Sequence, residues 1–126
     1  MSTLTVTNIK ATGETNSRAV SGVAAVLCHY DQNASPVSVE SSVNVSSVVD
    51  DTTGRSTVNI NNDMGNVNYI TVSGAGGTVS NFTLAAASVP EDSYAVGSYR
   101  VEVVYQHSTG AFDAPQIMTA VFGDLA

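Results

Sequence analysis

The sequence predicts an all-β protein: a single antiparallel β-sandwich or jelly-roll-like domain of about eight strands, with a short N-terminal arm. Apolar and polar residues alternate with period two along most of the chain, which is the pattern of half-buried strands. Clusters of Gly, Asn, Asp and Pro interrupt this alternation about every 8 to 12 residues, a spacing typical of sandwiches and barrels. Amphipathic helical periodicity is nearly absent. The 126 residues suit one domain.

We expect a boundary after residue 16, between an N-terminal arm and the sandwich domain. Residues 1–16 hold a short strand, LTVT, followed by the loop KATGETNS, and we expect this segment to be an attachment arm. Residues 17–126 form the sandwich domain. Its first strand runs over residues 19–30, where almost every side chain is apolar, so we expect both of its faces to be covered.

Three further strands are predicted in the middle of the chain. Residues 37–49 place valine mainly at odd positions and Ser, Glu or Asn at even ones, so one face is core and the other faces water. The turn DDTTGR leads into a strand over residues 56–61. After NNDMGN another strand covers residues 67–73.

The last third predicts three more strands. The tract GAGG at 74–77 is a loop, and TVSNFTLAAA at 78–87 is a strand. PEDSYAVG is the longest irregular connection of this half, with one helical turn at most. Two strong strands at 98–107 and 115–123 then close the chain as a hairpin around STGAFDA.

The charge balance narrows the classes of partner. Eleven acidic and four basic residues give a formal charge of -7 and a pI near 4.3. Nucleic-acid binding depends on clustered Lys and Arg, so DNA, RNA and anionic membrane surfaces are disfavoured partners. The chain shows no signal-peptide pattern and no apolar stretch near the roughly 20 residues that span a bilayer, so we expect a soluble, non-secreted protein.

The cysteine and histidines predict no metal or cofactor site. Cys28 is the single cysteine, and its apolar surroundings, VAAVLCHY, favour a small buried hydrophobe over a reactive thiol. His29 and His107 are the two histidines, too few with one cysteine for a zinc site. We expect a structural His29 and a solvated or loop-bonded His107. Either can make an oligomer interface respond to pH, since imidazole titrates near neutrality.

Two adjacent carboxylates, Asp50 and Asp51, stand between two apolar alternations. On a strand they would point to opposite faces and so could not act together on one substrate. In a turn, an Asp side chain accepts hydrogen bonds from backbone N–H groups, and Gly54 supplies the positive φ that closes the reversal. We therefore assign Asp50, Asp51 and Gly54 to a hairpin turn, with a cation site as the alternative.

No catalytic frame is evident, and we expect a non-enzymatic protein. A Gly-x-Ser-x-Gly motif is missing, and GAGG has neither a following helix nor a nearby Lys to hold a phosphate. Tyr99 and Tyr105 are in phase with neighbouring valines and predict core or a subunit seam. Tyr94 and Phe112 lie in connections and, with His107, are the candidate surface contacts.

Three stretches together resemble one family. MSTLTVTNI resembles the N-terminal strand of small virion proteins of tailed bacteriophages, especially those of marine and cyanobacterial hosts. VSSVVDDTTGRSTVNINNDMGNVNYITVSGAGG is similar to a recurrent module of tail-fibre-like proteins of such phages, and SYRVEVVYQHSTGAFDAPQIMTAVFG looks like its closing hairpin. The resemblance covers nearly the whole chain. It departs at Asp63-Met64-Gly65, where the family more often has an aromatic residue or Pro.

The resemblance implies a structural role on the virion surface, commonly as a homotrimer, and carries over no catalytic residue. The protein would be made in the bacterial host cytoplasm and would bind the major capsid protein or a tail-appendage protein. Since the chain has no repeat and no long shaft, we favour a head-decoration, cement or knob protein over a tail component. The alternative is a carbohydrate-binding, receptor-recognition module that uses Tyr94 and Phe112 on a host surface glycan.

Overall fold

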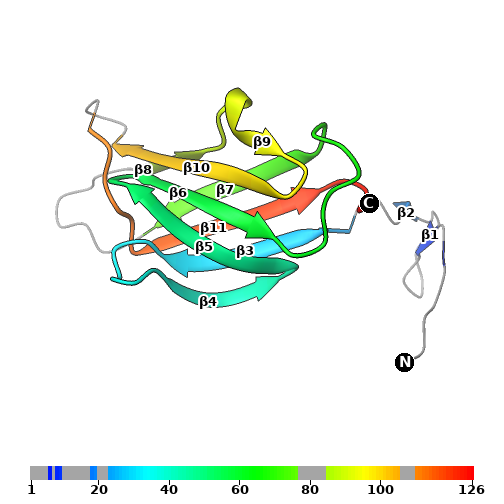
Figure 1. Cartoon of the computed structure of the whole chain (residues 1–126), viewed down its shortest axis with the longest axis horizontal. Helices are drawn as coiled ribbons and strands as arrows, with labels where there is room; N and C mark the ends of the chain where they lie inside the picture. The colour runs from blue at the N-terminus through cyan, green and yellow to red at the C-terminus, as the bar shows by residue number, and fades with distance from the viewer. Residues whose placement is uncertain (1–5, 7, 10–17, 20–22, 77–84, 106–109) are drawn as a thin grey trace.

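Two antiparallel sheets pack face to face in this computed structural model, which describes residues 6, 8–9, 18–19, 23–76, 85–105 and 110–126. Within these ranges the chain forms strands, one short 3-10 turn and no α-helix. No helix there has the length and apolarity needed to cross a membrane. The predicted all-β sandwich is confirmed, with nine strands in its two sheets (Figure 1).

Each sheet combines strands from distant parts of the chain. The four-stranded sheet runs in the order β4, β3, β11 and β7, which span Ser38–Val43, Val26–Asp31, Gln116–Phe122 and Ile70–Gly76. The five-stranded sheet has the order β5, β6, β10 and β8, spanning Val45–Thr52, Arg55–Ile60, Ser98–Tyr105 and Ala85–Ser88, and β9 at Tyr94–Ala95 also pairs with β10. The 3-10 turn η2 covers Glu91–Ser93.

The core lies between the sheets and is built by alternate residues of the strands. Its buried apolar side chains come from both sheets and from two connections: Val26, Cys28, Tyr30, Val58, Ile60, Met64, Tyr69, Tyr99, Val101, Val103, Ala114, Ile117 and Val121. The predicted period-two alternation of β6, β10 and β11 is confirmed, because this set contains alternate residues of each strand. Their period-two patterns were correct because each of these strands has one neighbouring sheet to bury against.

Two buried hydroxyl pairs join the sheets across this core. Tyr30 on β3 and Ser56 on β6 share a hydrogen bond of 2.6 Å between their hydroxyl oxygens. Tyr99 on β10 and Thr119 on β11 form a second one, also 2.6 Å long. Burial raises the pKa of both tyrosines well above the usual value, because the charged phenolate would lose its hydration. Each sheet is thus fixed against the other by a satisfied polar contact as well as by apolar packing.

Asn44 divides the long valine alternation predicted over residues 37–49. Its φ of 58° breaks the strand, so that β4 belongs to one sheet and β5 to the other. Its side-chain oxygen accepts the N–H of Asn62 at 2.8 Å, and its amide group donates to the Asn62 carbonyl at 3.0 Å. The expectation of one continuous strand with one core face was wrong, because the chain turns a corner here.

Two other predicted boundaries also differ. The first strand of the sandwich begins at Val26 rather than at residue 19, and GAGG does not form a loop over its whole length, because β7 continues to Gly76. The expected strand at 78–87 lies mostly outside the described residues, and its described end is β8.

A separate two-stranded sheet precedes the sandwich. β1 at Asn8–Ile9 pairs with β2 at Arg18–Ala19, and both lie beyond the end of the sandwich at which the chain terminates (Figure 1). The boundary expected after residue 16 therefore falls between two paired strands.

Candidate interaction surface

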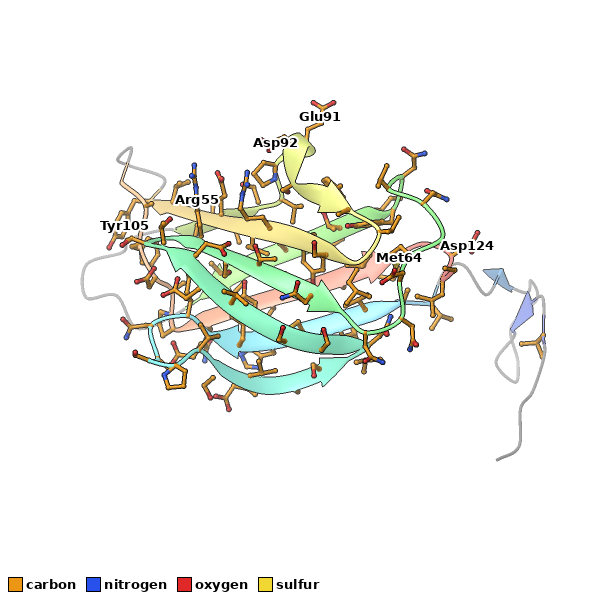
Figure 2. All side chains as sticks on the ribbon, in the orientation of Figure 1. Arg55, Met64, Glu91, Asp92, Tyr105 and Asp124 are labelled. Atoms are coloured by element: carbon orange, nitrogen blue, oxygen red, sulfur yellow. The ribbon has the colours of Figure 1, made fainter. Side chains whose placement is uncertain are left out.

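The two outer faces of the sandwich differ in chemistry. On the five-stranded sheet, the Arg55 guanidinium lies 3.0 Å from the Glu102 carboxylate on the neighbouring strand. Arg100 reaches Glu102 at 3.4 Å and Asp92 at 3.2 Å. Figure 2 shows Arg55 on β6 and Asp92 at η2 along this side of the molecule. This outer face is therefore a charged, hydrated surface.

The outer face of the four-stranded sheet carries a cluster of apolar side chains. Five large side chains that point away from the core are between 42% and 66% exposed: Leu27, Val43, Ile70, Val72 and Met118. Two half-buried residues of β11, Ala120 and Phe122, point the same way by strand alternation. We call these seven residues the apolar face.

Strand register brings the apolar face together. Leu27 on β3 lies opposite Val43 on one side and Ala120 on the other, and Ala120 in turn lies opposite Val72. Ile70 pairs with Phe122, which lies two residues after Ala120 on β11. β3 and β4 follow each other in the chain, but β7 and β11 are far from them in sequence, so only the sheet makes these residues one surface.

A shallow hollow crosses the apolar face. It has a volume of about 420 Å³ and is lined mainly by Leu27, Val72, Gly74, Met118 and Ala120. Gly74 forms part of its floor, and a Cβ placed there would meet nothing within 4 Å. The face therefore combines a depression with projecting side chains around it, which gives it shape as well as apolarity.

This surface corrects the expectation that the first sandwich strand is covered on both faces. Val26, Cys28 and Tyr30 are buried as predicted, but Leu27 is 42% exposed and His29 is half-buried on the opposite face. The signal in the sequence was the apolarity of both faces of residues 19–30 and of the final strand. It was interpreted as burial within one chain, although an exposed face gives the same pattern.

Asp50 and Asp51 are not turn residues. Both belong to β5, and the reversal is made at Thr53 and Gly54. A bulge after Asp50 separates the two carboxylates: Asp50 accepts a 3.2 Å hydrogen bond from the Gln32 amide, and Asp51 accepts one of 2.7 Å from the Thr57 hydroxyl. The turn assignment was wrong for these acids because pairing with β6 extends the strand past them.

Gly54 carries the turn as predicted. Its φ is 72°, and its N–H donates a 2.7 Å hydrogen bond to the Asp113 carboxylate. A Cβ at this position would lie 2.7 Å from the Val103 carbonyl oxygen and 2.8 Å from the Phe112 nitrogen. Both the backbone conformation and the close approach of the neighbouring segment therefore require glycine.

The aromatic contact candidates are engaged within the chain. The Tyr94 hydroxyl is 2.5 Å from the Thr71 hydroxyl, and its ring lies 5.1 Å from that of Tyr69. Phe112 stacks on Tyr105 with ring centres 4.1 Å apart. Tyr94 and Phe112 are both half-buried against the core rather than freely exposed. His107, the third candidate, lies outside the described residues.

The buried thiol has the environment of a packing residue. Cys28 is 3% exposed, and burial raises its pKa to about 11 because the thiolate would lose hydration. In the part of the chain that the structure describes, no three His, Cys, Asp or Glu side chains group in a way that could hold a metal ion.

The chain was compared with family models, with curated proteins and with solved structures, and no match was found in any of the three. The geometry of the two outer faces is therefore the main structural guide to function.

Proposed function

We propose that this protein is a non-enzymatic structural protein of a tailed bacteriophage, a homotrimeric β-sandwich on the particle surface. Within that role we favour a head-decoration, cement or knob protein bound to the major capsid protein over a tail-appendage component. The observation that carries the proposal is the apolar face, which gathers five large exposed apolar side chains on one sheet of an acidic chain, because a patch of this kind marks a surface that contacts other protein.

The polar groups of the sandwich support a structural role. Asp50, Asp51 and Asp113 each accept a hydrogen bond from Gln32, Thr57 and Gly54 respectively, so these carboxylates hold strands and turns together. The hydroxyl pairs between the sheets add rigidity. The resemblance of three stretches of the sequence to virion proteins supports a location on the phage particle.

The test is the position of the protein on intact particles. An antibody raised against the purified protein is applied to phage particles that encode it, and bound antibody is imaged by electron microscopy, with mass spectrometry of the same particles. We expect many copies spread over the capsid. Label confined to the tail vertex would shift the assignment to a tail appendage, and absence from purified particles would refute the virion role.

A carbohydrate-binding receptor module is the second candidate, and one observation favours it. The stacked rings of Tyr105 and Phe112 lie at an end of the sandwich (Figure 2), where an aromatic surface can pack on a sugar. Glycan-array binding that Phe112→Ala abolishes would support it, while wild-type protein that binds no host polysaccharide would exclude it.

A further inference from the structure

We propose that the apolar face, on the outside of β4, β3, β11 and β7, is the contact surface between copies of this chain. The inference rests on the self-association contained in the proposed function, but it does not depend on where the protein sits on a particle. The apolar face of one copy would pack against the apolar face of another copy.

The exposed apolar area supplies a substantial part of what such a contact would bury. Five side chains of the face are each 42% to 66% exposed. Their exposed surface amounts to on the order of 500 Å², within the range of the largest apolar patch on a typical monomer. The half-buried side chains, the glycines and His29 on the same side add to this area, toward the roughly 800 Å² per partner of a standard stable interface.

Electrostatics selects this face for contact between identical copies. Each copy carries a formal charge of -7, so copies repel one another unless they meet where charge is sparse. The outer face of the five-stranded sheet carries Arg55, Arg100, Glu102 and Asp92. The seven residues of the apolar face are uncharged.

Two acidic residues indicate where the contact is centred. Asp31 lies at the end of β3 and Glu40 on the edge strand β4, so both are at one margin of the four-stranded sheet. Like charges directly opposed across an interface are unfavourable, and a contact centred on β11 and β7 keeps these margins apart. The hollow lies in that same region.

The apolar face has both projecting and recessed parts. The hollow floored by Gly74 and Ala120 lies beside the projecting side chains of Leu27, Val72 and Met118. A surface that holds both a ridge and a depression can pack on the same face of another copy, either about a two-fold axis or with ridge against depression around a closed ring. Burial of Leu27 there would also cover the second face of β3.

The dimensions also suit three copies. Four strands about 4.8 Å apart make a face about 19 Å wide, and three such faces around an axis would each lie about 5 Å from it, half of the roughly 10 Å between packed sheets. Apolar side chains from three sheets would then fill the centre without a channel.

The experiment compares two matched substitutions by light scattering coupled to size-exclusion chromatography. Val72→Lys places a charge on the apolar face, and Val49→Lys is the control, because Val49 is a similarly exposed valine, 47% against 58%, on an edge strand of the other sheet. Met118→Lys repeats the test at a second position. Circular dichroism of each variant checks that the sandwich remains folded.

We expect wild type and Val49→Lys to be multimers, and Val72→Lys and Met118→Lys to be folded monomers, with self-association weakened at least about 100-fold by a buried unpaired charge. Multimeric Val72→Lys and Met118→Lys would overturn the assigned face while leaving the multimer intact. Monomeric Val49→Lys would show that the contact is not specific to this face. A monomeric wild type would overturn the inference, and antibody labelling of particles would still decide the virion role.

Discussion

Gly54→Ala is expected to destabilise the sandwich strongly. Gly54 has a φ of 72°, and its carbonyl accepts the N–H of Val103 at 2.8 Å, so the residue is fixed to β10. A Cβ would lie 2.7 Å from the Val103 carbonyl oxygen, 2.8 Å from the Phe112 nitrogen and 2.7 Å from the Ala111 Cβ. Two of these atoms are backbone, so relief requires movement of a paired strand or of the segment that packs on it.

The magnitude has two parts. A non-glycine residue in the left-handed region costs about 1 to 2 kcal/mol. Forcing an extra carbon into a packed site adds about 1 to 3 kcal/mol. We therefore expect the free energy of unfolding to fall by about 2 to 5 kcal/mol, a large part of the roughly 5 to 15 kcal/mol typical of a domain.

Urea unfolding followed by circular dichroism measures this loss. All variants are compared at one protein concentration, because any self-association would make apparent stability depend on concentration. Gly65→Ala is the control, since its Cβ would lie an ordinary 3.4 Å from the Asp124 carbonyl oxygen. Gly54→Asn separates the two parts, because Asn tolerates positive φ but still carries the clashing Cβ. A Gly54→Ala variant as stable as Gly65→Ala would show that neither the positive φ nor the close contacts require glycine at this position.

Three further outcomes follow from the core and the corner. Tyr30→Phe leaves the buried Ser56 hydroxyl without its partner and should lower the free energy of unfolding by about 1 to 3 kcal/mol. Addition of Ser56→Ala should recover part of the loss. Urea unfolding that gives the single and double variants the same free energy of unfolding would contradict this. Asn44→Ala removes the hydrogen bonds to Asn62 and places at the positive φ a residue that tolerates it less well than Asn. The melting temperature of this variant should fall by several degrees in calorimetry. An unchanged value would mean that the corner does not need the Asn44 side chain. Burial raises the pKa of Cys28 to about 11 from 9.0, so the folded state keeps a proton that the unfolded chain releases. The free energy of unfolding should therefore be level up to about pH 9 and fall as the pH rises from there to about 11. A melting temperature that rises over this range would be inconsistent with the buried thiol.

Local pattern predicted those strands whose burial depends on one neighbouring sheet. The alternation predicted in residues 98–107 and 115–123 is found in β10 and β11, where alternate residues are buried. Gly54 was also predictable, because a turn between two alternations requires a residue that adopts positive φ. These features follow from steric properties of a few adjacent residues.

Other features depended on pairing between distant segments. Asp50 and Asp51 have the composition of a turn, but the ladder with β6 keeps them in the strand and moves the reversal to Thr53 and Gly54. The last glycines of β7 are strand residues because β11 lies beside them, with Gly76 opposite Gln116. Asn44 ends β4 through its bonds to Asn62, a residue that a reading of adjacent positions does not bring near it.

Side-chain alternation and turn chemistry act over a few residues, so they were enough to predict an all-β sandwich with a charge-poor, valine-rich interior. Which apolar faces are buried and which stay exposed depends on which sheet lies opposite each strand, and this is visible only once the sheets are assembled. Leu27 and Cys28 are neighbours in one apolar run, yet Cys28 packs against the second sheet and Leu27 faces outward. That difference places one side of a predicted core strand on the exposed apolar face.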